Sequence, residues 1–184
     1  MEETMIIKII FGIFLTIGSL VLFFLAFKLF YKYLIQEKRC TSKTKGIVKG
    51  YTLGNRGGEN SGVCLPVIRY SINGKEYKVI GPEYKSYLIR TVSSPLTTEN
   101  DMEFSEDEKQ RLLVKYNVNS IITIHKNPMR ILYPIDSEVD VFYDPNNPKL
   151  AYVLRYCNRK SMFWLMFIGG LATLLTDISI LLFL

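Results

Sequence analysis

Two long apolar runs at the ends of the chain predict two transmembrane helices. Residues 9–27 are 19 positions without a charge, and residues 162–184 are 23 positions with one charge, Asp177. An α-helix rises about 1.5 Å per residue, so each run is long enough to cross a hydrocarbon core of about 30 Å. We therefore expect transmembrane helices over about residues 6–35 and 161–184.

Between these runs the pattern changes to short, β-branched segments separated by Gly, Pro and Asn, which is typical of strands. The segments with this pattern are residues 44–51, 63–72, 75–80, 120–125, 139–143 and 151–155, with 129–133 as a further candidate. Residues 54–62 are rich in Gly and predict a hairpin loop, because a phosphate-binding loop would need a following Lys-Ser/Thr and a helix. The middle of the chain therefore predicts a mainly-β domain, a small sandwich or barrel.

Two turns in this region have specific chemistry. Asn73-Gly74 predicts a type I′ hairpin, because that turn needs two positive φ angles. The sequence from Asp144 to Pro148 predicts a rigid turn, because proline fixes φ and Asx side chains bond to nearby backbone. The residues expected to form that turn are Asp144, Pro145, Asn147 and Pro148.

An acidic run in the middle of the β pattern predicts one short inserted helix. Its six acids are Glu99, Asp101, Glu103, Glu106, Asp107 and Glu108. Ser105 and Glu108 have capping-box spacing, and acids in a first turn suit the helix dipole, so we expect a helix over about residues 106–117. The acids are either a solvated cap region or a docking patch, for a basic partner or for basic residues of the same domain.

The distribution of charge predicts which side of the membrane holds the middle domain. The net charge is +6, and basic residues follow the first apolar run and precede the second, whereas Lys8 is the only one outside them. By the positive-inside rule, both termini are outside and the domain is cytoplasmic. We divide the chain into a first helix with its extension (1–36), a β domain (40–157) and a second helix (161–184). A cleaved signal peptide with a secreted domain fits less well, because the first residues are net acidic and no A-x-A site follows.

The chemistry-bearing residues give no catalytic, metal or cofactor site. Cys40, Cys64 and Cys157 are an odd number without C-x-x-C, which indicates reduced thiols, although a Cys40–Cys157 disulfide stays open. His125 is the only histidine; a zinc site or a Ser-His-Asp triad built on it lacks the necessary spacing. Nothing in the pattern favours nucleic-acid binding.

Small and hydroxyl residues predict the packing faces of the two apolar helices. One face of each helix carries such residues at helical spacing: Gly12, Thr16 and Ser19 on the first, and Gly169, Thr173 and Asp177 on the second. If the inner ends are level, Asp177 lies opposite Gly12. We expect Asp177 to face the first helix or a partner helix; alternatives are that it reaches the headgroups or pairs with Lys8.

Three blocks of sequence carry a resemblance to a known family. They are T-K-G-I-V-K-G-Y at 44–51, P-V-I-R-Y-S-I-N-G-K-E-Y at 66–77 and V-D-V-F-Y-D-P-N-N-P at 139–148. This arrangement between two membrane helices resembles the bacterial domain of unknown function 3592 family. The resemblance implies a small membrane-tethered β domain and supplies no catalytic residue. Residues 94–128 look like an insertion relative to that pattern.

Together these features predict a multi-pass protein of the bacterial plasma membrane. We expect a non-enzymatic adaptor, accessory or immunity-type protein that contacts the lipid bilayer and binds another membrane or cytoplasmic protein. The alternatives are a membrane-tethered enzyme or ligand sensor with a pocket in the β domain, and a subunit of a membrane transport complex. The sequence leaves the oligomeric state open.

Overall fold

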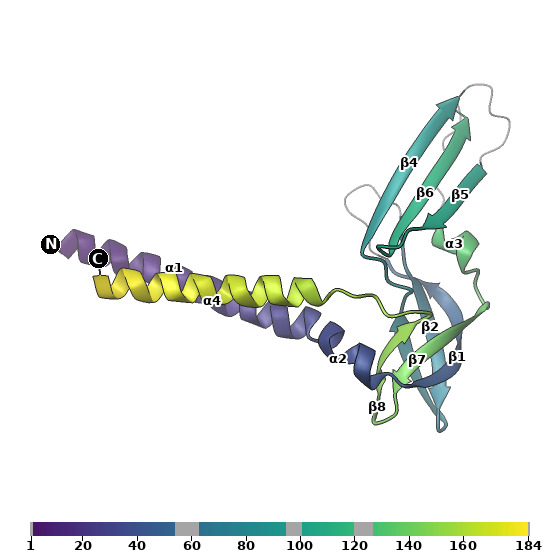
Figure 1. The fold of residues 1–184 in the computed structure, drawn as a ribbon, viewed down its shortest axis with the longest axis horizontal. Coiled ribbons are helices and arrows are strands. Elements are labelled where there is room, and N and C mark those ends of the chain that lie inside the picture. Colours follow the sequence, from purple (N-terminus) through teal and green to yellow (C-terminus); the bar gives the residue numbers. More distant parts are fainter. Residues whose placement is uncertain (1, 54–62, 95–100, 120–126, 184) are drawn as a thin grey trace. The chain divides into compact units, whose positions relative to one another are not determined.

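The computed structural model describes residues 2–53, 63–94, 101–119 and 127–183. The chain divides into two compact units, one formed by Met1–Ile35 with Asn158–Leu184 and the other by Gln36–Cys157 (Figure 1). The first unit is helical and the second is mainly β. Two apolar helices therefore flank a mainly-β domain.

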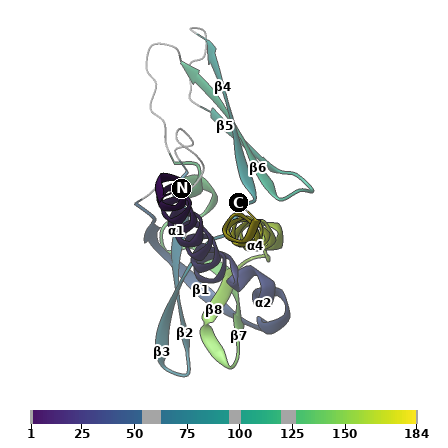
Figure 2. The ribbon, with the colours of Figure 1, turned by 90° about the vertical axis from the view of Figure 1, so that its left-hand side faces the viewer.

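The helical unit is a pair of helices that lie side by side (Figures 1 and 2). Helix α1 (Glu2–Leu25) continues through a π-helical turn (Ala26–Phe30) towards α2 (Lys32–Arg39), and α4 (Lys160–Phe183) packs along α1. Edge-to-face aromatic contacts join the two helices, with ring centroids 5.4 Å apart for Phe23–Phe167 and 5.5 Å apart for Phe27–Phe163. Both predicted helices are present, and both are long and apolar enough to cross a membrane.

The first sheet of the β domain is a nearly closed five-stranded barrel. Its strands are β1 (Ser42–Tyr51), β2 (Pro66–Ile72), β3 (Lys75–Ile80), β7 (Glu138–Asp144) and β8 (Asn147–Val153), all antiparallel, in the order β3-β2-β1-β7-β8. The two end strands, β3 and β8, lie in contact. Of the two predicted architectures, the barrel is the one observed.

The interior of this barrel is filled by alternate residues of each strand. Val48, Ile68, Val141 and Val153 are almost fully buried there. Gly46 also lies inside, between strands β2 and β7, where no side chain has room: a Cβ would stand 2.5 Å from Ile68 Cγ2 and 2.8 Å from Val141 Cγ2. The packing of β1 inside the barrel therefore requires glycine at position 46.

The outer side of β1 forms ion pairs with β7. The ammonium groups of Lys43 and Lys45 each lie 2.8 Å from a carboxylate oxygen of Asp140. The hydrogen bond from Lys43, and after it the one from Lys45, stabilises the charged carboxylate. Both hold the pKa of Asp140 below its ordinary value.

The first predicted turn is confirmed, and the second is confirmed at residues 145–146, whereas Asn147 and Pro148, which we expected in that turn, begin strand β8. Asn73 and Gly74 have φ angles of 50° and 77°, as a type I′ turn requires, and they join β2 to β3. Asp144 is buried and accepts a hydrogen bond of 2.9 Å from the Asn146 backbone N–H, so it acts in turn geometry. Pro148 contributes its carbonyl, which accepts a hydrogen bond from the Tyr70 hydroxyl. Strand β8 begins at Asn147, four residues before the predicted start of the last strand.

The second sheet has three strands, β4 (Ser86–Ser94), β5 (Asp101–Glu106) and β6 (Arg111–Asn119), in the order β4-β6-β5. Strands β4 and β6 are parallel, whereas β5 and β6 are antiparallel. Its core contains Val63, Leu65, Tyr84, Leu112, Val114, Tyr116 and Met129. The last of these belongs to a one-turn helix, α3 (Met129–Leu132).

The predicted helix over residues 106–117 is wrong. These residues are the end of β5, a tight turn and most of β6, and Ser105 and Glu108 form no capping box. The turn is closed by Asp107, which accepts hydrogen bonds from the backbone and side chain of Arg111, while Gln110 takes a φ of 58°. Leu112, Val114 and Tyr116 share the buried face, which is the periodicity of a strand and not of a helix.

Four further predictions differ from the structure or fall outside it. The candidate strand at 129–133 is wrong, because Asn127 Oδ1 accepts the Met129 N–H at 3.2 Å and the short helix α3 follows. The second strand begins at Pro66 rather than at residue 63. The predicted strand 120–125 and loop 54–62 lie outside the described residues.

Candidate functional site

The three-stranded sheet has one buried and one exposed face, because successive side chains of a strand point in opposite directions. Leu112, Val114 and Tyr116 of β6 point into the core. On the other face, Leu88 and Val92 of β4 are 45% and 40% exposed. Large apolar side chains are thus presented to the outside by a sheet whose opposite face already fills a core.

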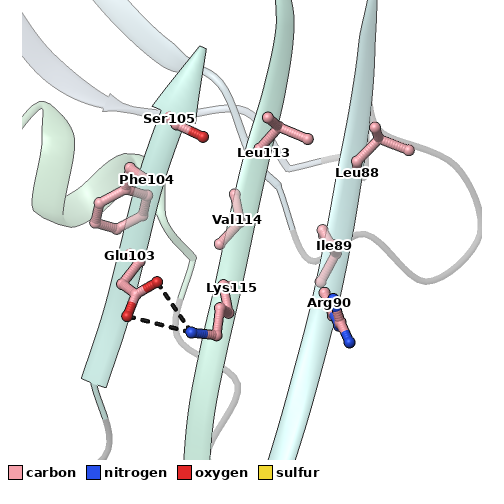
Figure 3. A pocket seen from close by; sticks show the side chains of 9 residues that line it. All are labelled: Leu88, Ile89, Arg90, Glu103, Phe104, Ser105, Leu113, Val114 and Lys115. Carbon is pink, nitrogen blue, oxygen red and sulfur yellow. Dashed lines mark hydrogen bonds and ion pairs between the residues drawn. The ribbon is translucent and has the colours of Figure 1, made fainter. Parts of the chain in front are cut away.

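Strand register arranges this exposed face in two rows, which Figure 3 shows side by side. Leu113 of the central strand is paired with Leu88 on one side and with Ser105 on the other. Two residues further along β6, Lys115 is paired with Arg90 and with Glu103. We call these six residues the outer face: Leu88, Arg90, Glu103, Ser105, Leu113 and Lys115. Together with Ile89, Phe104 and Val114 of the same strands, they line a depression of about 550 Å³.

The charged row of the outer face has one more cation than anion. The Lys115 ammonium lies 3.1 Å and 3.3 Å from the two carboxylate oxygens of Glu103. Both side chains are about half exposed, so this pair is worth at most about 1 kcal/mol. Arg90 forms no ion pair within the part of the chain that the structure describes. The row therefore offers a guanidinium group, beside two leucines, to an external acceptor.

The acidic run, which we expected to be either a solvated cap region or a docking patch, is divided among contacts within the domain. Glu103 pairs with Lys115, and Asp107 pairs with Arg111 at 2.5 Å. Glu106 lies 2.5 Å from the Arg155 guanidinium. Of the others, Asp101 begins β5, Glu108 is exposed in the turn, and Glu99 lies outside the described residues.

Arg155, at the end of the β domain, contacts residues at the core of the three-stranded sheet. Besides its ion pair with Glu106, its guanidinium donates to the Glu83 carbonyl at 3.0 Å and lies 4.8 Å from the centre of the Tyr84 ring. Burial raises the pKa of the Tyr84 hydroxyl far above its ordinary value, so this ring stays neutral beneath the cation. The acidic run thus serves in part the basic residues of its own domain, one of the two roles we considered for it.

Two hydrogen bonds join the small and hydroxyl residues of the two apolar helices, and one of them reaches Gly170 rather than the predicted Gly169. The Thr16 hydroxyl donates to Asp177 Oδ2 at 2.6 Å, and the Ser19 hydroxyl donates to the Gly170 carbonyl at 2.8 Å. Gly12 and Ser19 are both buried. The Thr173 hydroxyl bonds to the Gly169 carbonyl of its own helix at 2.8 Å.

Asp177 therefore faces α1, as we expected. It accepts its hydrogen bond from Thr16, however, which lies one helical turn from Gly12, the residue predicted to be opposite Asp177. The ion pairs among the described residues do not include one between Asp177 and Lys8.

All three cysteines are free thiols, so the alternative of a Cys40–Cys157 disulfide is not what the structure has. The Cys40 thiol donates to the Leu150 carbonyl at 3.3 Å, and burial raises its pKa to about 11. A thiol with that pKa is not a nucleophile near neutral pH. Among the described residues, no three His, Cys, Asp or Glu side chains are grouped as metal ligands. His125 lies outside the described residues.

Sequence reasoning missed the outer face because it missed strand β4. Residues 86–92 include Tyr, Leu, Ile, Thr and Val, which is the composition of a strand. This composition was sufficient to predict strand β4. The pairing of β4 with β6 is parallel and non-local, so no hairpin signal in the sequence predicts it.

One comparison with known proteins gives a match. A family model described as a domain of unknown function (DUF3592) matches residues 44–157. No curated protein and no solved structure matches the chain significantly. The match spans the eight strands of the described residues except the first two positions of β1, and it confirms the resemblance noted from the sequence blocks.

Proposed function

The chain belongs to the DUF3592 family of domains of unknown function, and from that premise we propose a membrane-anchored, non-enzymatic binding protein. In this proposal α1 and α4 cross the bacterial plasma membrane, both termini are outside, and the β domain on the cytoplasmic side binds another protein as an adaptor, accessory or immunity-type protein.

The membrane part of the proposal is supported by helix length and charge. The two apolar helices expose large side chains around most of their surface, including Phe14, Leu20, Leu165 and Leu182. A helix pair with such a surface would aggregate in water but is matched to lipid. The basic residues flank the apolar spans on the side of the β domain, which favours a cytoplasmic domain.

The protein-binding part depends on one observation, the outer face of the three-stranded sheet. The exposed Leu88 and the half-buried Leu113 lie beside Arg90, which has no ion-pair partner among the described residues. An apolar centre with arginine is the usual composition of a protein-binding patch. The complementary surface is an apolar side chain flanked by a carboxylate: the apolar group covers Leu88 and Leu113, and the carboxylate accepts from Arg90.

A ligand-binding role is the second candidate, favoured by the size of the same depression. Its volume of about 550 Å³ is in the range of small-molecule sites. Such sites, however, enclose most of the ligand surface, whereas this one lies on the open side of a sheet. The openness makes a protein the better occupant.

In-cell photo-crosslinking tests the protein-binding role. A photo-reactive amino acid replaces Leu88 in the full chain, and the matched control carries it at Ile47, a similarly exposed apolar residue on β1 of the barrel. We expect a discrete crosslinked protein at Leu88, absent at Ile47 and lost when Arg90→Glu is added. Equal crosslinking at both positions, or a pattern unaffected by Arg90→Glu, contradicts the proposal.

A further inference from the structure

The helical unit contains a buried carboxylate, Asp177. Asp177 is 3% exposed, and its Oδ2 accepts the hydrogen bond from Thr16, but Oδ1 has no hydrogen-bond partner among the described residues. A buried carboxylate is costly in any apolar setting, and an unsatisfied oxygen adds to that cost.

The carboxylate lies at a groove on the outside of the helix pair. The groove encloses about 310 Å³ and is lined by Ile9, Gly12, Ile13, Thr16, Ile17 and Asp177. Gly12 and Thr16 are four residues apart on α1, the spacing at which small residues let another helix approach closely. Around them stand three isoleucines, each at least half exposed. Shape and composition therefore suit a third helix.

Lipid cannot satisfy the free oxygen, because acyl chains have no hydrogen-bond donors. A cationic side chain on the third helix can satisfy it and also balance its charge, as pairs of ionisable groups within membranes do.

The described residues of a second copy of this chain do not supply a hydrogen-bond donor for Asp177 Oδ1. The hydroxyls of Thr16, Ser19, Thr173, Thr176 and Ser179 already donate within their own helix pair. Copies with the same orientation place equal-numbered residues at equal depth, so Lys8 stands eight residues from the level of Thr16, about 12 Å along the helix. Among the described residues a second copy therefore offers no donor at this depth, which favours a different protein as the source.

We propose that this groove binds a transmembrane helix of a partner protein that carries an Arg or Lys side chain at the depth of Asp177. The proposal rests on the membrane insertion of α1 and α4 proposed above. It adds to the cytoplasmic outer face a second contact, inside the membrane, and it assigns Asp177 the role of pairing with the partner's cation.

The test uses the full chain reconstituted in phosphatidylcholine vesicles with a designed single-span probe peptide. The probe is a leucine-rich helix with one Arg about 10 Å from its end, the depth of Asp177, seven residues from the chain end. The control peptide has Leu in place of the Arg. Energy transfer between labelled protein and labelled peptide reports association.

We expect the Arg peptide to associate about tenfold more strongly than the Leu peptide, since polar contacts between helices in lipid contribute about 1–2 kcal/mol. Asp177→Leu should abolish this preference. Thr176→Leu, next to it on an exposed position of α4, should keep it. Equal association of the two peptides with the unaltered chain overturns the groove proposal, as does a preference that survives Asp177→Leu.

Two controls separate this proposal from the one it rests on. Resistance of the reconstituted chain to alkaline extraction reports insertion; a chain that is extracted overturns both proposals, whereas an inserted chain without preference overturns the groove alone. Energy transfer between two labelled copies, abolished by Asp177→Leu, would assign the groove to self-association and also overturn the proposal.

Discussion

A single methyl group added at Gly46 should destabilise the barrel. In Gly46→Ala the new Cβ would lie 2.5 Å from Ile68 Cγ2, 2.8 Å from Val141 Cγ2 and 3.2 Å from the Arg69 carbonyl oxygen. Both methyl groups belong to β-branched side chains, which have little freedom to rotate away on a strand. One of the three neighbours is backbone and is held by the pairing of β1 with β2. The strands must therefore move apart.

The cost follows from two opposing terms. Overpacking a well-packed interior costs about 1–3 kcal/mol. Replacing Gly by Ala also restricts the unfolded chain and returns about 0.4–1 kcal/mol. Gly50→Ala is the matched control, because Gly50 lies on the same strand with nothing within 4 Å of its Cβ position. The unfolded-state term is common to both, so the free energy of unfolding should differ between the variants by about 1–3 kcal/mol.

Hydrogen–deuterium exchange of the full chain in detergent measures this difference locally. Amides of β1, β2 and β7 in Gly46→Ala should open about 5- to 150-fold more often than in Gly50→Ala, the factor that corresponds to 1–3 kcal/mol. Equal protection in the two variants would refute the close packing of β1 against Ile68 and Val141.

Three further outcomes are expected. Gly74→Ala places a side chain at a φ of 77°, so it should lower the free energy of unfolding by about 1 kcal/mol in a denaturant titration; an unchanged midpoint would argue against the type I′ turn. In the purified protein at about pH 8, a thiol reagent should modify the half-exposed Cys64 and spare Cys40, whose pKa is about 11; similar rates at both would contradict the burial of Cys40. The pKa of Asp140 is depressed by its lysine partners, so its stabilisation is present above its unfolded value of about 3.9 and is lost as pH falls through the folded pKa. Unfolding measured from about pH 6 to pH 2 should therefore depend less on pH in Asp140→Asn, and identical profiles would be the contrary result.

The parts of the fold that sequence could predict are those fixed by local signals. Charge-free runs of sufficient length mark the two helices, and Asn73-Gly74 fixes the register of β2 with β3 because the turn type sets the pairing. Strand β7 and the turn at Asp144 follow from alternation and from Pro and Asx chemistry.

The three-stranded sheet could not be predicted in this way. Leu112-Leu113 in sequence fits a helix face as well as a strand, and acids before it resemble a helix start. What decides for strand is the non-local pairing of β6 with β4 and β5, together with a turn held by Asp107 and Arg111. The same non-local pairing creates the outer face, so that site was also hidden. In the helix pair, small residues at helical spacing indicated the contact faces, but side-chain packing set the level of Asp177 one turn away.

Labelling by a membrane-impermeant thiol reagent tests most directly the claim that two helices anchor a cytoplasmic β domain. The reporters are Cys64 and, in a Cys64→Ser background, a cysteine in place of Lys109, which is exposed in the β5–β6 turn. Both should react in permeabilised cells and remain unlabelled in intact cells, with the chain retained in the membrane after alkaline extraction. Labelling of either reporter in intact cells would place the domain outside, and loss of the chain on extraction would contradict the anchor itself.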